Sequence, residues 1–262
     1  MLRRLLFLGL FLAHNIVVLA QSPGGPREIT VAAAADLSSA LRQVADVYQN
    51  KTGVQVKLSF GSSGGLTQQI ENGAPFDVFL SADMDYPARL IKGGYADQSS
   101  LYRYAVGRLV LWVASDSPLD PAKAGIQVLF DPLVKKIAIA NPEHAPYGRA
   151  AVAVFQHYGV YERVSSRLVL GENVAQAAQF VESGNAQAGM VALARVLSTE
   201  LKDRGKYWLV PADACPQIDQ GIVVLTHSTH RQDGFAFVEF MKTAAAAAIL
   251  RRYGFELPAE KQ

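Results

Sequence analysis

The chain has 262 residues, half of them apolar and only 18% charged, which supports a large buried core and excludes a disordered chain. Its 25 Lys and Arg residues against 23 Asp and Glu give a formal charge of +2 without a basic block, so charge alone attracts no nucleic acid. A single cysteine excludes a disulfide framework and a cysteine-based zinc site.

The chain opens with the pattern of a secretory signal peptide. Arg3 and Arg4 form a basic start, residues 5–20 are mostly apolar, and small residues stand at the positions that a signal peptidase reads. This pattern predicts cleavage after Ala20, so we expect residues 1–20 to be removed and the rest to be exported. A membrane anchor is the alternative, but the apolar run is short and contains two polar residues.

Strands and helices alternate along the first part of the exported chain. Alternating or continuous apolar runs predict strands at 28–33, 54–60, 76–80 and 107–114. Between them, apolar residues recur at helical spacing, first in a helix that Asp36 is placed to cap and Gly53 to follow. A small-residue loop at 61–65 leads into the second helix.

The same alternation continues to the end of the chain. Strands are predicted at 136–140, 167–170, 188–192, near Trp208 and at 222–225, and helices at 147–158, 174–183 and 235–252. Strands that alternate with helices indicate an α/β fold with parallel or mixed sheets covered on both sides. Because no linker rich in Ser, Gly and Pro separates two halves, two lobes would have to share the chain by crossing over.

Four junctions at predicted helix starts carry the chemical information. They are Ala35-Asp36, Ser62-Ser63-Gly64, Pro146-Tyr147-Gly148 and Glu172-Asn173-Val174. The first N–H groups of a helix have no intrahelical acceptor and lie at the positive end of its dipole. Several such ends that converge make an anion site without a lysine or arginine. A single junction of this kind is more simply a helix cap and a turn.

The small-residue loop also matches a hydrolase pattern. Gly61, Ser63 and Gly65 form G-x-S-x-G between a predicted strand and helix, the setting of a nucleophile elbow. Four histidines of the exported chain could supply the base: His144, His157, His227 and His230. The strand before the loop has one wet face and no HGGG-type stretch is present, so an exported serine hydrolase that uses Ser63 is the weaker interpretation.

Five stretches together resemble the periplasmic molybdate-binding proteins, the substrate-binding components of ABC-type molybdate importers. They are ITVAAAADL at 29–37, SFGSSGGLTQQIENGAPFDVFLSAD at 59–83, NPEHAPYG at 141–148, GENVAQA at 171–177 and RYGF at 252–255. The resemblance implies a class II periplasmic binding protein fold, with two α/β lobes, two mixed sheets and two chain crossovers. The expected lobes are 27–107 with 219–262, and 108–218.

The resemblance also implies a set of ligand-binding residues. Ser63 matches a hydroxyl ligand, and Tyr147 and Val174 match positions that donate backbone N–H groups. Ala35 and Asp36 match a first-loop site where the family often has serine. A carboxylate there would repel a dianion, so we expect Asp36 to turn away as a helix cap. Some members place a tyrosine that reaches the ligand where this chain has Ala192.

These matches lead to one functional hypothesis with open alternatives. The cargo is molybdate or tungstate, held through its oxygens with no direct metal-cation site, no cofactor and no catalysis. If Asp36 points inward, it could accept the proton of hydrogen phosphate, so phosphate or sulfate is the rival ligand. The implied partner is an ABC permease at the inner membrane, and the protein is expected to be a periplasmic monomer that binds no nucleic acid.

Overall fold

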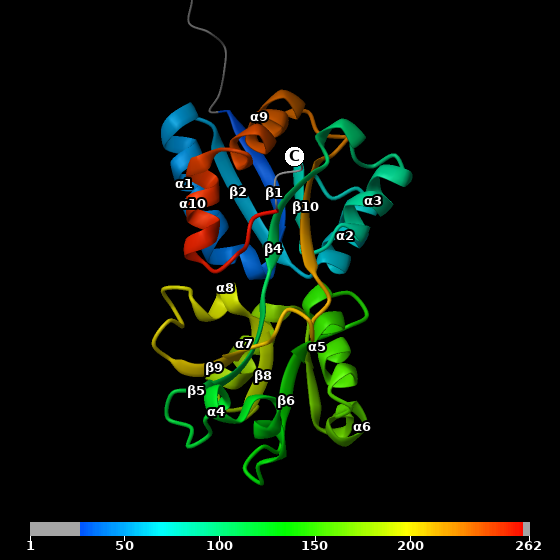
Figure 1. Ribbon diagram of the computed structural model, residues 1–262. Coiled ribbons are helices and arrows are strands. Elements are labelled where there is room, and N and C mark those ends of the chain that lie inside the picture. The colour runs from blue at the N-terminus through cyan, green and yellow to red at the C-terminus, as the bar shows by residue number, and fades with distance from the viewer. Residues whose placement is uncertain (1–26, 259–262) are drawn as a thin grey trace, which may run out of the picture.

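Two five-stranded mixed sheets form the centres of two lobes in the computed structural model, which describes residues 27–258 (Figure 1). The predicted signal peptide lies outside the described residues. The strands of the first sheet, in spatial order, are β2 (Gln55–Gly61), β1 (Glu28–Ala34), β3 (Val78–Ser81), β10 (Ile218–Val224) and β4 (Tyr102–Gly107). Those of the second are β7 (Leu168–Gly171), β6 (Ile137–Ala140), β8 (Ala188–Ala192), β5 (Leu109–Ala114) and β9 (Gly205–Leu209).

The two sheets are built on the same plan. In each sheet the first three strands in spatial order are parallel to one another. The fourth strand, β10 in the first sheet and β5 in the second, runs antiparallel to both of its neighbours. Parallel neighbours need helical crossovers, and these helices cover the sheets. The predicted α/β class with two mixed sheets is therefore confirmed.

The helices lie on both sides of the sheets. The first lobe carries α1 (Ser38–Thr52), α2 (Ser63–Glu71), α3 (Asp85–Lys92), α9 (Arg231–Met241) and α10 (Ala244–Arg252). The second carries α4 (Pro121–Ala124), α5 (Pro146–His157), α6 (Tyr161–Val164), α7 (Val174–Glu182) and α8 (Leu193–Val196). Short 3₁₀ turns are η1 (Ala35–Leu37), η2 (Gln98–Ser100), η3 (Gly125–Phe130) and η4 (Ser165–Arg167). Between residues 27 and 258, no helix combines the length and apolarity needed to cross a membrane.

The chain passes between the lobes at two places. β4 ends at Gly107 in the first sheet and β5 begins at Leu109 in the second, with only Arg108 between them. The return runs from β9 to β10 through residues 210–217. The prediction of one strand at 107–114 was therefore wrong at its start. Gly107 ends β4 in the first sheet, and the apolar run from Leu109 forms β5 in the second.

The C-terminal helix also differs from its prediction. Residues 235–252 form parts of two helices, α9 and α10, separated at Lys242 and Thr243. The Thr243 hydroxyl accepts a hydrogen bond from Ala246 N, and this cap starts α10. The alanine run favours helix but cannot fix where one helix ends and the next begins.

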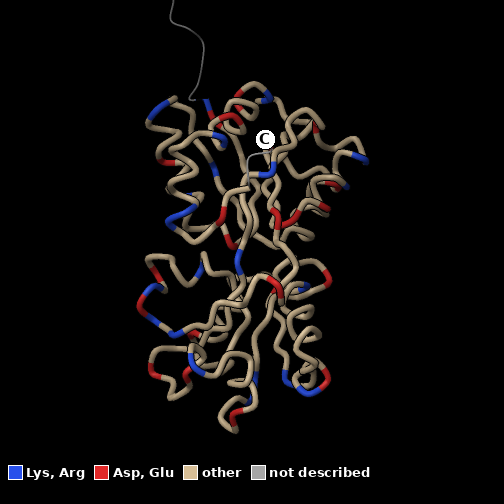
Figure 2. Tube along the Cα trace, in the orientation of Figure 1, with Lys and Arg blue, Asp and Glu red and all other residues tan. Residues whose placement is uncertain are grey.

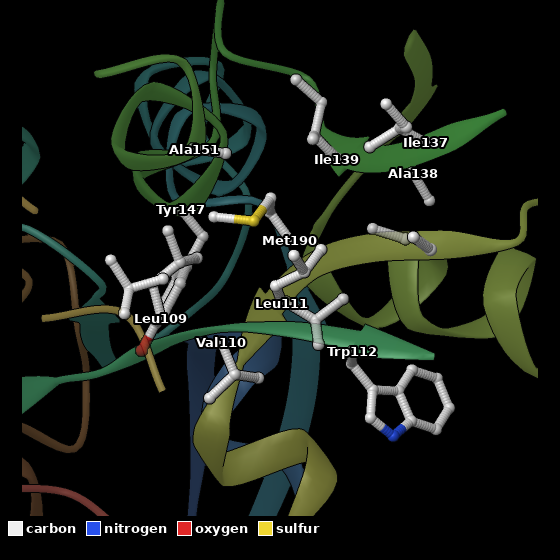
Figure 3. Close-up of a cluster of buried hydrophobic side chains, with 14 of the residues drawn as sticks. Leu109, Val110, Leu111, Trp112, Ile137, Ala138, Ile139, Tyr147, Ala151 and Met190 are labelled. Carbon is white, nitrogen blue, oxygen red and sulfur yellow. The ribbon is translucent and has the colours of Figure 1, made fainter. Parts of the chain in front are cut away.

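Each lobe has its own buried core. In the second lobe, side chains of β5, β6, β8 and α5 form one cluster that includes the fully buried Leu111 and Met190 (Figure 3). Phe155 on α5 is also fully buried in this core. In the first lobe, α1 buries Leu41, Val44 and Tyr48, the face predicted from their spacing. These cores hold the helix starts that face the cleft in fixed positions.

Candidate functional site

Four helical starts meet in one pocket between the lobes. The pocket has an empty volume of about 200 Å³. The residues that line it are Ala34, Ala35, Asp36, Gly61, Ser62, Ser63, Ala82, Ala145, Pro146, Tyr147, Asn173 and Val174. All five residues implied by the resemblance are in this set. The structure thus brings together Ala35, Asp36, Ser63, Tyr147 and Val174, while their binding of an oxyanion stays a prediction.

The first lobe contributes the start of α2. Ser62 is the N-cap, and its hydroxyl accepts a hydrogen bond from Gly65 N at 3.3 Å. Ser63 is the first helical residue, so its backbone N–H has no intrahelical acceptor. Its Oγ accepts a hydrogen bond from Ala82 N at 3.0 Å, which leaves the hydroxyl hydrogen free to donate. Two donors of one residue are therefore available at this end of the pocket.

The second lobe contributes the starts of α5 and α7. Pro146 occupies the first turn of α5, where its missing N–H costs nothing, and Tyr147 follows it. Asn173 caps α7, and its Oδ1 accepts hydrogen bonds from Ala175 N at 3.0 Å and Gln176 N at 3.1 Å. The N–H of Val174 is thereby left to the pocket.

Asp36 does not cap α1, contrary to the prediction. It lies inside η1, and α1 begins two residues later at Ser38, with Leu37 as an N-cap that makes no side-chain hydrogen bond. Its carboxylate instead accepts a hydrogen bond from Gln220 on β10, with 2.5 Å between Gln220 Nε2 and Asp36 Oδ2. The side chain is fully buried, and this burial raises the pKa of Asp36 to about 6.

Contacts across the cleft hold the lobes together around the pocket. Gly64 N donates to His144 O at 2.8 Å, and Ser62 Oγ lies 3.0 Å from His144 Nδ1 and 3.1 Å from Glu172 Oε1. A Cβ on Gly64 would lie within 2.5 Å of the Tyr86 hydroxyl and 2.7 Å of His144 Cβ. Glycine is therefore required at this position for the lobes to approach so closely.

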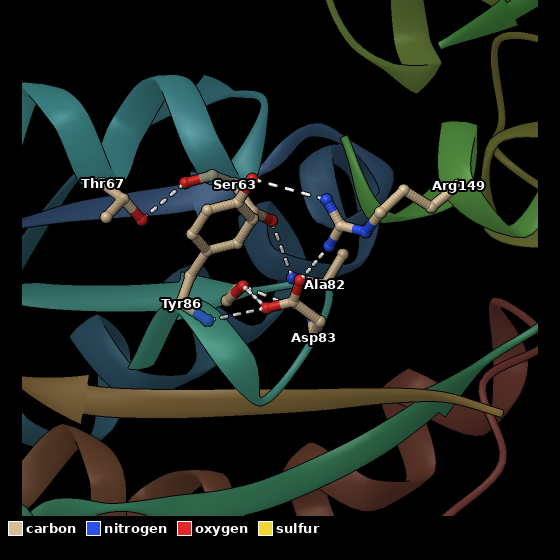
Figure 4. A network of polar contacts seen from close by, with 7 residues as sticks. Ser63, Thr67, Ala82, Asp83, Tyr86 and Arg149 are labelled. Atoms are coloured by element: carbon tan, nitrogen blue, oxygen red, sulfur yellow. Dashed lines mark hydrogen bonds and ion pairs between the residues drawn. The ribbon is translucent and has the colours of Figure 1, made fainter. Parts of the chain in front are cut away.

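An arginine beside the cleft is already paired. Arg149 on α5 donates to Asp83, which follows β3, and its guanidinium lies 5.5 Å from the centre of the Tyr86 ring (Figure 4). Asp83 Oδ1 also accepts hydrogen bonds from Ser81 Oγ and Tyr86 N. This network is a further bridge between the lobes. Within residues 27–258, none of the side chains that line the pocket is a lysine or an arginine.

The charged residues of the described chain give no single-sign face. Figure 2 shows Lys, Arg, Asp and Glu interspersed over both lobes. Among residues 27–258, no group of three or more His, Cys, Asp and Glu side chains is placed to hold a metal ion. The pocket is thus a set of N–H and O–H donors with one buried carboxyl group, which suits a small anion rather than a cation.

Sequence reasoning missed one residue of the site and left two questions for the structure. Gln220 was not singled out, because it stands between Asp219 and Gly221, before the apolar run that predicted a strand at 222–225, and no local pattern marks it as buried. Ala192 is buried at the end of β8 and does not line the pocket. In the described residues, the hydroxyl beside a histidine belongs to Ser62 and not to Ser63, which weakens the hydrolase interpretation.

The fold and the pocket define a class: a two-lobed α/β binding protein of the periplasmic type, with its site where the two lobes meet. Residues 29–256 match the family model of bacterial extracellular solute-binding proteins, and the chain belongs to this family.

Within this family, the chain is similar to proteins named for molybdate binding. The chain is 41% identical over 230 residues to the molybdate-binding protein ModA of Azotobacter vinelandii, covering 88% of this chain and 90% of that protein. It is 38% identical over 233 residues to ModA of Rhodobacter capsulatus, covering 89% and 90%. The solved structure of the Azotobacter vinelandii periplasmic molybdate-binding protein superposes with a TM-score of 0.82 and 36% identity, covering 88% of this chain and 99% of that one. The predicted resemblance to the periplasmic molybdate-binding proteins is confirmed.

Proposed function

We propose that this protein captures molybdate, or its analogue tungstate, in the pocket between the lobes and delivers it to an ABC permease. The names of the relatives at 38–41% identity support molybdate as the cargo. Ser63 would donate its hydroxyl and backbone N–H, and Tyr147 and Val174 their backbone N–H groups. Ala35 and Asp36 would complete the site through the backbone of η1. Every contact goes to an oxygen of the anion, so none of these residues is a ligand of a metal cation.

One observation carries the proposal: the unsatisfied N–H groups of several helix starts share one small pocket. Among the hydrogen bonds of residues 27–258, none uses the backbone N–H of Ser63, Tyr147 or Val174. A fully ionised tetrahedral oxyanion offers only acceptors, so it satisfies all of these donors at once. An ordinary helix cap explains each junction alone but not their convergence from two lobes.

A second ligand class is favoured by the buried carboxyl group of Asp36. A protonated oxyanion such as hydrogen phosphate would donate a hydrogen bond to this carboxyl group. A pocket of N–H and O–H donors alone would give that proton no acceptor. Sulfate lacks that proton and would be separated from molybdate by size. The relatives' names favour molybdate over both.

The remaining parts of the proposal concern how the protein works in the cell. It acts as an exported monomer in the periplasm, binds without catalysis, and does not bind nucleic acid. The lobes are 27–107 with 219–262, and 108–218. The first boundary is supported by Arg108, which lies between β4 and β5, and the second falls one residue after Ile218, where β10 begins in the first sheet.

Thermal unfolding of the exported chain with sodium molybdate, tungstate, sulfate or phosphate tests the cargo. A ligand at 100 times its Kd adds about 2.7 kcal/mol of stability. For a chain of this size that is a shift of roughly 5–10 °C in Tm. We expect the shift with molybdate and tungstate. A shift with phosphate or sulfate alone would reassign the cargo, and modification of a serine by a phosphonate probe without any oxyanion shift would favour a hydrolase.

A further inference from the structure

The carboxyl group of Asp36 is only half satisfied. Asp36 is 1% exposed, and its Oδ1 is a buried oxygen without a hydrogen-bond partner among residues 27–258. Its Oδ2 accepts from Gln220 Nε2. The Tyr104 hydroxyl donates to Gln220 Oε1 at 2.7 Å, and this bond fixes the amide so that its NH₂ faces Asp36. A buried carboxylate with one free oxygen is costly unless it carries a proton.

The titratable groups around Asp36 do not supply a positive charge. Tyr104 on β4 and Tyr147 on α5 are both buried, and burial together with the charge of Asp36 raises the pKa of each well above its usual value, so both stay neutral. The Tyr147 hydroxyl and the backbone N–H groups of Asp36 and Leu37 lie close enough to lower the pKa of Asp36, but the effect of burial is larger. The Cys215 thiol lies near enough to act on Tyr147, and burial raises the pKa of Cys215 to about 11, so it is neutral as well. Asp83 adds a further negative charge, since its field acts on Tyr104.

The cations of the neighbouring elements are held elsewhere. Arg149 on α5 pairs with Asp83, and Arg103 on β4 pairs with Asp219. Arg195 on α8 donates to Ser38 Oγ at 2.8 Å and lies 3.3 Å from Glu200. An incoming dianion therefore meets a buried carboxyl group in a small pocket in which no described cation screens the two negative charges.

We propose that the protein takes up one proton from solvent when it binds a fully ionised oxyanion, and that this proton resides on the carboxyl group of Asp36. The inference rests on the proposed function, because it concerns how the same pocket accepts its ligand. The proton forms an O–H bond to the carboxylate, and no other bond forms or breaks. The loaded pocket then contains one dianion and a neutral Asp36, which removes the repulsion that two facing acceptors would create.

The electrostatics set the pH range of this uptake. Burial already raises the pKa of Asp36 to about 6 in the empty pocket, and a neighbouring dianion raises it further. Above pH 7 the empty pocket is deprotonated and binding must recruit the proton. Near pH 5 the group is already protonated, so the uptake falls toward zero. Linkage then requires the Kd for molybdate to rise by about tenfold per pH unit above pH 7.

Calorimetric titration of the exported chain with sodium molybdate at pH 8 measures the proton directly. Binding enthalpies in HEPES and in Tris differ by the ionisation enthalpies of the buffers multiplied by the number of protons taken up. We expect one proton for the wild type and none for Asp36→Asn, which keeps the shape and places an amide donor beside the ligand. The Asn variant should also bind with a Kd that changes little between pH 7 and 9.

The outcomes separate this inference from the proposed function. Molybdate binding without proton uptake in the wild type, or equal uptake in Asp36→Asn, would overturn the inference and leave the cargo intact. Absence of molybdate binding by the wild type at every pH would overturn the proposed function itself. The pH dependence of the wild-type Kd provides the same decision if Asp36→Asn fails to fold.

Discussion

Ser62 Oγ lies 3.0 Å from His144 Nδ1, and this contact joins the start of α2 in one lobe to the loop before α5 in the other. The same hydroxyl donates to Glu172 Oε1 at 3.1 Å, in the turn before α7. Three of the helix starts that form the pocket are therefore tied together by side chains at its rim. Because these contacts join the two lobes, they stabilise the arrangement in which the lobes meet and would be lost if the lobes moved apart.

Replacing His144 with alanine should weaken the closed arrangement. The variant loses a side-chain hydrogen bond of about 0.5–1.5 kcal/mol, but the backbone bond from Gly64 N to His144 O remains. We expect a Kd for molybdate about 2- to 10-fold higher, mainly through faster dissociation. Stopped-flow measurement of the dissociation rate checks this. His157→Ala, at the exposed end of α5, is the matched control, and equal rates in both variants would show that the contact across the cleft is not used.

Replacing Ser63 with alanine should remove a donor from the pocket itself. The loss of a hydrogen bond to a charged ligand costs about 1–3 kcal/mol, so the Kd should rise by at least fivefold. Ala82 N also loses its acceptor, so part of the cost falls on the apo protein. Calorimetric titration measures the affinity and thermal unfolding the apo stability. Ser183→Ala, at the exposed far end of α7, should change neither, and an unchanged Kd in Ser63→Ala would exclude Ser63 from the site.

Replacing Asn173 with alanine should affect both stability and binding, because the cap orients the start of α7. Its Oδ1 accepts from Ala175 N and Gln176 N, and the loss of such a cap costs about 1 kcal/mol of unfolding free energy. Thr243→Ala removes the cap of α10, far from the pocket in the first lobe. We expect similar losses of stability by urea unfolding in the two variants, but weaker molybdate binding only in Asn173→Ala. Equal affinities would show that the orientation of α7 does not matter to the ligand.

Local sequence signals were sufficient for the helix starts and insufficient for the contacts between lobes. Hydroxyl, proline and asparagine residues at the starts of α2, α5 and α7 mark caps that depend on a few neighbouring residues. The bond between Gln220 and Asp36 joins residues 184 positions apart, so no local pattern contains it. Asp36 was expected to cap α1 because it precedes an apolar helical face, but the buried amide offered its carboxylate a closer partner.

The transfer of the chain between sheets shows the same limit. Residues 107–114 are a continuous apolar run apart from Arg108, and nothing local indicates that the sheet changes within it. Tertiary packing decides where the chain leaves the first sheet. The Tyr147 hydroxyl, from α5 of the second lobe, lies so close to Gly107 that a Cβ there would collide with it. The lobe crossover therefore depends on a contact between two residues that lie 40 positions apart.

The stability of the ligand-free protein should also depend on Asp36. Its pKa is raised in the folded state to about 6 from the ordinary value of 3.8, so the native state binds this proton more tightly than the unfolded state. The resulting stabilisation is fully present below about pH 4, and it is lost as the pH rises through about 6. A shift of this size corresponds to about 3 kcal/mol, since each pKa unit is worth about 1.4 kcal/mol. The Asn side chain of Asp36→Asn cannot ionise, so the variant does not lose this stabilisation as the pH rises. Between pH 4 and pH 7.5, the unfolding free energy of the variant relative to the wild type should therefore increase by up to about 3 kcal/mol. Urea unfolding of both proteins without oxyanion measures the difference, and a constant difference across this range would mean that Asp36 ionises as freely in the folded protein as in the unfolded chain.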